Sequence, residues 1–123
     1  MVEAQPTTEE QADAAREFKR VVNMTPAALR KWLGSAASRS VGMTPQGEKI
    51  THDGEGESVG HEMGERILAL QAKHAAELDE DDYRAMRKVV GYVHRHGKQR
   101  PHGDITDTRW RKSLMNWGHD RLK

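Results

Sequence analysis

Hydrophobic residues recur at the spacing of an α-helix in five segments of this 123-residue chain. The first spans 8–23 and the second runs from Thr25 to about residue 36, and each begins with a threonine suited to capping a helix. Pro26 occupies the first helical position of the second segment, where its missing amide hydrogen is not needed. The expected apolar stripes are Ala14, Ala15, Phe18, Val21 and Val22, and then Leu29, Trp32, Leu33 and Ala36.

Three further helical segments lie in the second half of the chain. The third begins at Ser58, the fourth spans 79–97, the fifth spans 106–118, and a glycine closes each of the last two. Leu122 is expected to fold back onto the fifth. The expected stripes are Val59, Met63, Ile67 and Leu70, then Tyr83, Met86, Val90 and Val93, and finally Trp110, Leu114 and Trp117. No segment alternates with period two, so the sequence predicts an all-α fold.

Two glycines and a histidine stand out in the third helical segment. Gly60 and Gly64 each cost about 1 kcal/mol inside a helix, so their four-residue spacing predicts a close approach by a neighbouring helix. His61 begins a run that resembles the zinc-protease motif HExxH, but Glu65 stands at the second ligand position. The helical wheel places His61 away from the apolar face, and we expect no metal there.

Residues 38–57 are rich in glycine, serine and threonine, and predict a mobile loop between the second and third helices. Gly42 and Gly47 have the spacing of a phosphate-binding P-loop, but Glu48 occupies the position of its lysine. The glycines of 54–60 also miss the spacing of a dinucleotide-binding loop. The sequence thus predicts a small bundle of about five helices with one long glycine-rich loop.

Composition indicates one domain. We expect a flexible lead-in at 1–7 and a single helical domain over 8–123. The chain has no cysteine, no apolar run long enough to span a membrane and no apolar core of a secretory signal near Met1. We therefore expect a cytoplasmic protein without membrane contact.

Charge divides the chain into two unlike parts. Residues 1–83 carry 9 basic and 16 acidic side chains, whereas 84–123 carry 11 basic and 3 acidic ones, together with four of the seven histidines. On the fourth helix, Arg84, Lys88 and Arg95 fall on the face opposite the apolar stripe, and Tyr92 is expected beside them. An outward basic face suits the phosphates of a nucleic acid. The candidate nucleic-acid-binding residues are Arg84, Lys88, Arg95, Lys98, Arg100, Arg109, Arg111 and Lys112.

Two interpretations of this basic face remain open: it binds a polyanion, or it is a solvated surface that complements the acidic first part of the chain. The connection between the last two helices is about nine residues, longer than the three or four of a helix-turn-helix, so base-specific reading is not predicted. His94 and His96 point about 200° apart on a helix and cannot share a metal. No catalytic constellation is evident, and we predict neither an enzyme nor a bound metal or cofactor.

Four segments resemble a known family, number 3140 of the domains of unknown function. The closing run WRKSLMNWGHD at 110–120 carries the likeness most specifically. The other segments are DYRAMRKVVGYV at 82–93, GHEMGERI at 60–67, and VNMT at 22–25 leading into LRKWL at 29–33. The resemblance covers about residues 15–123. It implies that some relatives carry a DNA-binding label, and it implies no activity, cofactor or catalytic residue.

The sequence therefore favours a small helical protein that binds DNA or another polyanion without catalysis, through its basic C-terminal part. The alternative is a protein-interaction or oligomerisation module, including a homo-oligomer, that uses the helix containing Trp110 and Trp117. Salt dependence separates the two, because phosphate binding weakens steeply with ionic strength and an apolar interface does not.

Overall fold

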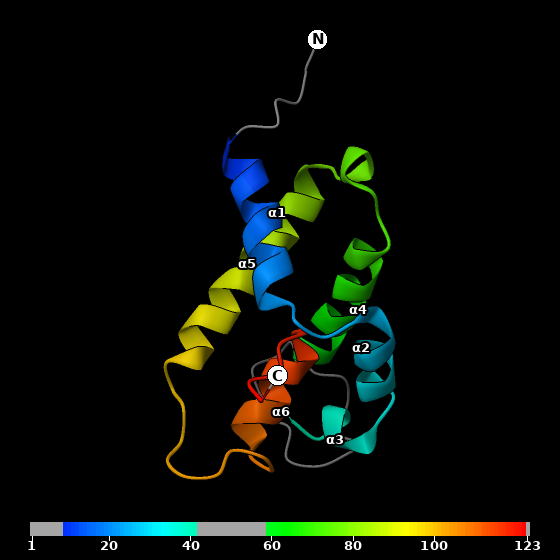
Figure 1. Ribbon diagram of the computed structural model, residues 1–123. Helices are drawn as coiled ribbons and strands as arrows, with labels where there is room; N and C mark the ends of the chain where they lie inside the picture. Colours follow the sequence, from blue (N-terminus) through cyan, green and yellow to red (C-terminus); the bar gives the residue numbers. More distant parts are fainter. Residues whose placement is uncertain (1–8, 42–58, 123) are drawn as a thin grey trace.

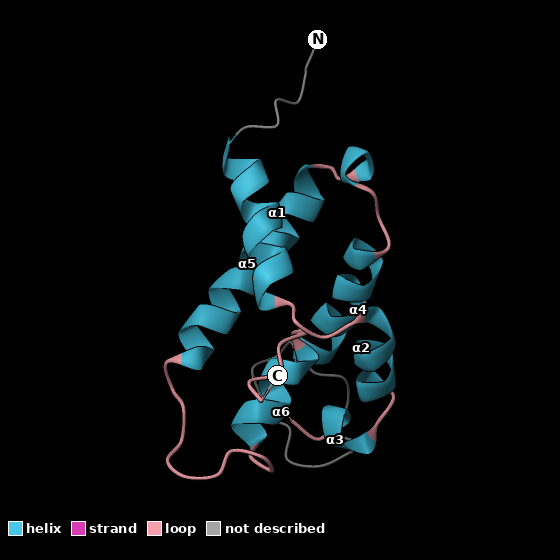
Figure 2. Cartoon of the chain, viewed as in Figure 1, coloured by secondary structure: helices cyan, strands magenta, loops and turns pink. Residues whose placement is uncertain are grey.

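The computed structural model describes residues 9–41 and 59–122, and every described element is helical. The α-helices are α1 (Glu9–Val21), α2 (Pro26–Leu33), α3 (Ala36–Arg39), α4 (Val59–Gln71), α5 (Glu80–Gly97) and α6 (Arg109–Asn116), with a 3₁₀ turn, η1 (Ala75–Glu77), before α5 (Figure 1). The described chain holds no strand, as Figure 2 shows, and the all-α prediction is confirmed. The prediction of about five helices missed α3 and η1, which are too short to show a helical period.

The helices pack in two groups. α1 lies along α5, and the two run in the same direction (Figure 1). The second group is α2, α3, α4 and α6, in which α6 contacts each of the other three. One hydrophobic core joins the groups, and it includes Phe18 of α1, Val89 of α5, Leu29 of α2 and Leu114 of α6.

Local side-chain bonds explain most of the helix starts. The Thr25 hydroxyl accepts the Ala28 amide at 3.1 Å, as a threonine N-cap should. The Asp79 carboxylate accepts the Asp82 amide at 2.9 Å, and Asp82 in turn accepts the Asp79 amide at 3.1 Å. This reciprocal capping box fixes the start of α5. The expected lead-in at 1–7 and the expected helix starts at Thr8 and Ser58 lie outside the described residues.

Several expected boundaries differ from the structure. α6 begins after Thr108, whose hydroxyl accepts the Arg111 amide at 3.1 Å, and not at Thr106–Asp107. Thr106 instead donates its hydroxyl to Asp104 at 2.6 Å. Gly97, expected as the cap, is instead the last residue of α5, and Lys98 is the C-cap. Gly118 does follow α6 in a left-handed conformation, with φ of 78°.

The buried stripes also needed correction. Val89 is fully buried where Val90 was expected, and Val90 is only partly buried against the core. Leu122 is 51% exposed and does not fold back. The predicted mobile loop begins too early, because Ser38 and Val41 are buried and the Ser35 hydroxyl caps α3. The rest of that segment, 42–57, lies outside the described residues. No helix among those described is long and apolar enough to cross a membrane.

Candidate nucleic-acid interface

The outer face of α5 carries a line of cations. Arg84, Lys88, Arg95 and Lys98 follow one another at steps of four, seven and three residues, which keeps them within about 80° of one another around the helix. Lys88 to Lys98 spans about 15 Å at 1.5 Å per residue. Arg100 lies in the segment that leaves α5. We name Lys88, Arg95, Lys98 and Arg100 the basic stripe.

Burial of the opposite face keeps the basic stripe in solvent. Tyr83, Met86, Val89 and Val93 form the core side of α5. All four side chains of the basic stripe are exposed, and none forms an ion pair with another described residue. The stripe thus has charge available for a ligand.

The other four predicted binding residues are placed differently. Arg84 is exposed but forms an ion pair with Asp81 at 2.8 Å, one turn earlier in α5. Lys112 is mostly covered and lies 3.0 Å from Asp107. Arg109 is exposed at the start of α6 but makes a further interaction within the chain, so we do not include it in the stripe.

Arg111 stabilises the fold. The sequence predicted it as an exposed phosphate contact, but its side chain is mostly covered and hydrogen-bonded within the chain. Its side chain is 19% exposed, and it donates twice to the Asp120 carboxylate, from Nε to Oδ1 and from Nη2 to Oδ2, each at 3.0 Å. Nη1 also donates to the Thr106 carbonyl at 2.8 Å. The same contacts lower the pKa of Asp120, chiefly through the Arg111 hydrogen bonds. A guanidinium held this way has few donors left for phosphate.

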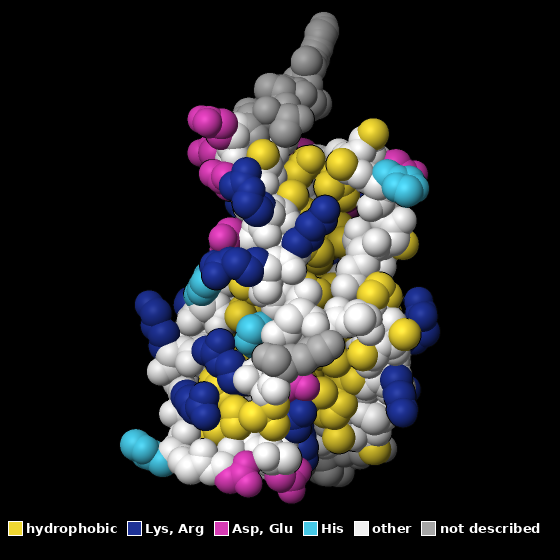
Figure 3. All heavy atoms as spheres, viewed as in Figure 1, with side chains coloured by type: hydrophobic (Ala, Val, Ile, Leu, Met, Phe, Trp, Pro, Cys, Tyr) yellow, Lys and Arg dark blue, Asp and Glu magenta, His cyan; other side chains and the backbone are white. Residues whose placement is uncertain are grey.

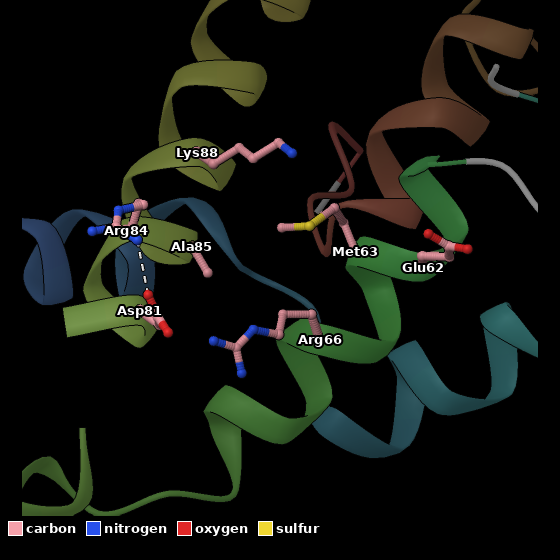
Figure 4. Close-up of a pocket in the computed structure, with 7 residues that line it drawn as sticks. All are labelled: Glu62, Met63, Arg66, Asp81, Arg84, Ala85 and Lys88. Atoms are coloured by element: carbon pink, nitrogen blue, oxygen red, sulfur yellow. Dashed lines mark hydrogen bonds and ion pairs between the residues drawn. The ribbon is translucent and has the colours of Figure 1, made fainter. Parts of the chain in front are cut away.

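A shallow groove of about 390 Å³ separates α4 from α5 beside the basic stripe. Figure 4 shows Lys88 reaching toward Met63, Arg66 pointing toward Asp81, and Glu62 turned away from the other side chains. Met63 and Ala85 supply the apolar part of its lining. Since two carboxylates and three cations line this groove, it has mixed charge and does not extend the basic stripe.

Beside the groove, Asp82 ties α4 and the following turn to α5. It is buried, and it binds Arg66 at 2.9 Å and Lys73 at 2.7 Å. Burial alone would raise the pKa of Asp82, but the hydrogen bonds from Lys73 and the Asp79 amide, with the nearby cations, hold it below its usual range. Arg66 and Lys73 are therefore occupied in the fold.

Aromatic side chains face inward, including Tyr92, which was expected on the outer face. Tyr92 stacks on Trp117, with ring centroids 4.1 Å apart, and on His96 at 5.1 Å. Burial raises the pKa of Tyr92 to about 12. Trp110 donates its indole hydrogen to the His96 carbonyl at 2.7 Å. Trp110 and Trp117 are both buried, so the prediction that they pack in the core is confirmed.

The segment after α6 closes onto the turn between α1 and α2, a contact that sequence reasoning missed. The Met24 amide donates to the Gly118 carbonyl at 3.2 Å. Asn23 bonds twice to the backbone of Asp120, accepting its amide at 2.8 Å and donating to its carbonyl at 3.0 Å. His119 places Nδ1 2.7 Å from the Val21 carbonyl. The sequence signal was present, because both halves of this contact lie in segments that carry the family resemblance.

His61 is buried, and the expectation that it points away from the apolar face was wrong. It is 4% exposed, with Nε2 2.8 Å from the Leu33 carbonyl. α4 is contacted by both α2 and α6, so a residue outside its apolar stripe can also be buried. The close approach predicted at the two glycines is confirmed: a Cβ on Gly64 would lie 2.6 Å from both the Asn116 carbonyl oxygen and a Leu33 methyl. Among the described residues, no group of histidine and carboxylate side chains could hold a metal ion.

Asn116 is the polar centre of the α2, α3 and α6 junction. It is buried, and its Oδ1 accepts the Trp32 indole hydrogen at 2.8 Å and the Ser38 hydroxyl. Its Nδ2 donates to the Ser38 carbonyl at 3.1 Å. Every polar atom of this side chain is thus bonded within the chain, which identifies a structural role.

Lysine and arginine side chains are spread over the surface. On the face seen in Figure 3 they lie apart, with polar or hydrophobic surface between them, and do not merge into one continuous patch. The basic residues that cluster along the sequence in 84–123 therefore do not appear as one patch on this face. The basic stripe is defined by the lack of ionic partners among the described residues and by its position on and just after α5, not by charge density.

Residues 17–115 match DUF3140, a family described as a protein of unknown function. No curated protein and no solved structure matches the chain. The match covers most of the chain, including α5 and nearly all of α6. The chain belongs to the DUF3140 family.

Proposed function

We propose that this protein binds the phosphate backbone of DNA or a similar polyanion, without catalysis, through the basic stripe of α5. The observation that supports this proposal is that four consecutive exposed cations of 88–100 have no ionic partner among the described residues. Each could replace a counterion on a phosphate chain, which is the main source of non-specific affinity.

The charge distribution along α5 limits where the polyanion sits. The first turn holds Glu80, Asp81 and Asp82, whereas the last turn holds Arg95 between two histidines. Insertion of the first turn into a DNA groove would bring carboxylates toward phosphates. The proposal therefore places the contact along the second half of α5, with backbone contacts rather than base reading.

The alternative, an interaction module built on the tryptophan-containing helix, has less support. The indoles of Trp110 in α6 and of Trp117 at its C-cap are packed within their own chain, and the exposed large hydrophobic side chain of the described residues is Leu122. A partner that used Trp110 or Trp117 would have to unpack the core. We therefore prefer the polyanion proposal.

The test is a titration of fluorescent duplex DNA at several salt concentrations. We expect a dissociation constant of about 10⁻⁴–10⁻⁶ M near physiological salt. Replacing all four stripe residues by glutamine should reduce the slope of log affinity against log salt by up to about 3 to 4. The control variant changes four exposed cations outside the stripe to glutamine: Lys19, Arg30, Lys31 and Arg39. Equal weakening by both variants, or no binding by the natural protein at low salt, would refute the proposal.

A further inference from the structure

We infer that the basic stripe is built for the double-stranded backbone and discriminates against single strands. The inference rests on the proposed polyanion binding and adds the class of nucleic acid. It is carried by two observations: where the aromatic rings lie, and how the backbone of α5 spaces the cations.

The first observation is that the protein has no exposed Phe, Tyr or Trp ring on which a base could stack. The chain has three tryptophans, two tyrosines and one phenylalanine, and all six belong to the described residues. Phe18, Tyr83, Trp110 and Trp117 are buried. Trp32 is half-buried, with its indole hydrogen bonded to Asn116, and the half-buried Tyr92 is stacked on Trp117 and His96.

Exposed imidazoles do not replace them. The exposed histidines of the described chain lie on three separate segments: His74 before η1, His94 on α5 and His102 in the connection to α6. His94 lies 3.8 Å from the Glu17 carboxylate. Proteins that hold single strands use successive rings, each contributing about 1–3 kcal/mol per stacked base. Three scattered imidazoles do not form such a series.

The second observation is that three of the stripe cations are spaced by one regular helix: Lys88 and Arg95 lie on α5, and Lys98 is its C-cap. Capping by Asp79 and packing of Val89 and Val93 against the core fix the course of α5. Lys88, Arg95 and Lys98 are therefore spaced over about 15 Å along the helix axis. A duplex offers phosphates at fixed spacing and at higher linear charge density than a single strand, and it needs no ordering to meet this line.

Without stacking, affinity depends on phosphate contacts alone, and these favour the duplex. The expected number of counterions released per contact is about 0.9 on duplex DNA and about 0.7 on a single strand. Over four contacts this difference favours the duplex at low salt, and the ordering of a flexible strand adds to it.

The experiment compares a duplex of about 20 base pairs with one of its own strands, both fluorescently labelled, at the same low salt concentration. We expect the duplex to bind about tenfold more tightly or better, and Arg95→Gln with Lys98→Gln to weaken duplex binding selectively. The matched control is Arg30→Gln with Lys31→Gln, which removes the same charge from the last turn of α2. This control should leave duplex affinity nearly unchanged.

Each outcome has a distinct meaning. Equal or tighter binding of the single strand would overturn the inference while leaving the proposed polyanion binding intact. Duplex preference that is unaffected by the α5 variant, or equally reduced by the α2 control, would also overturn it, because the preference would then arise elsewhere. Failure of the natural protein to bind either ligand would instead reject the proposed function itself.

Discussion

Two neighbouring segments of the basic C-terminal part use the same kinds of side chain in opposite ways. In 88–100, the cations of the basic stripe are exposed and have no ionic partner among the described residues. In 109–121, Arg111 is bonded to Asp120 and Thr106, and Arg121 donates to the Gly97 carbonyl at 3.3 Å. The cations of the first segment are accessible to solvent or a ligand, whereas Arg111 and Arg121 of the second are bonded within the fold.

The difference lies in the partners and not in the cations. Arg121 also lies over the Trp110 ring, 5.7 Å from its centroid, and forms a cation–π contact with it. Within the described parts of the chain, no carboxylate or ring is paired with the stripe in this way. A count of positive charges in this part of the sequence therefore overstates the surface available to a polyanion.

The largest expected effect comes from removing a ring that joins the two groups of helices. Trp117→Ala should lower the free energy of unfolding by about 3–5 kcal/mol, since it removes a buried indole and its stack on Tyr92. Urea denaturation measures this change. Leu122→Ala is the control, because Leu122 is 51% exposed and should change little. A tryptophan variant as stable as the natural protein would show that the ring is not packed as described.

A smaller contrast separates two helical glycines. Gly64→Ala should cost about 1–3 kcal/mol, because its Cβ would meet the Asn116 carbonyl oxygen and Leu33 at 2.6 Å. Gly91→Ala should stabilise by about 0.5–1 kcal/mol, since its Cβ would meet only the mobile end of Arg95 at 3.0 Å. Thermal denaturation of the two variants tests the pair. Similar effects at both positions would contradict the close packing of α4 against α6.

A gentler effect is expected from pH. Burial, and then the nearby Arg121 charge, lower the pKa of His119, and burial lowers the pKa of His96. Below the ordinary histidine pKa of about 6.5, the unfolded chain therefore binds more protons than the folded chain. The contribution of these two histidines to the free energy of unfolding should be fully present above that pH and should be lost on acidification.

The pH effect can be assigned with two variants. His119→Asn keeps a donor for the Val21 carbonyl but cannot titrate, and it should reduce the loss in urea midpoint between about pH 8 and pH 5. His102→Gln, at an exposed position, should not. An unchanged loss in the asparagine variant would remove His119 from this account.

The sequence predicted the regular parts of the fold well. Long amphipathic stripes located α1, α4 and α5, and the Thr25–Pro26 start identified α2, because these signals depend on residues within one or two turns. Gly60 and Gly64 even indicated which face of α4 is closely approached. Short elements such as α3 were missed because four residues do not complete a hydrophobic period.

The candidate site was less predictable because exposure and pairing depend on the whole chain. The position of Arg84, Lys88 and Arg95 on the outer face of α5 followed from helix periodicity. The burial of Tyr92 did not, since it depends on Trp117, which caps α6 and lies 25 residues away in sequence. The bond from Arg111 to Asp120 likewise requires the turn after Gly118, whose course no local pattern gives.

We propose that the cations of the basic stripe bind a ligand, whereas Arg111 and Arg121 stabilise the fold. The most direct test compares Arg95→Gln with Arg111→Gln, which remove the same guanidinium charge. Each variant is assayed for urea stability and for duplex DNA affinity at low salt. We expect Arg95→Gln to weaken binding with stability within about 1 kcal/mol of the natural protein. Arg111→Gln should lose stability and keep its affinity where it remains folded. The reverse pattern, or equal effects of both variants on both properties, would contradict the account.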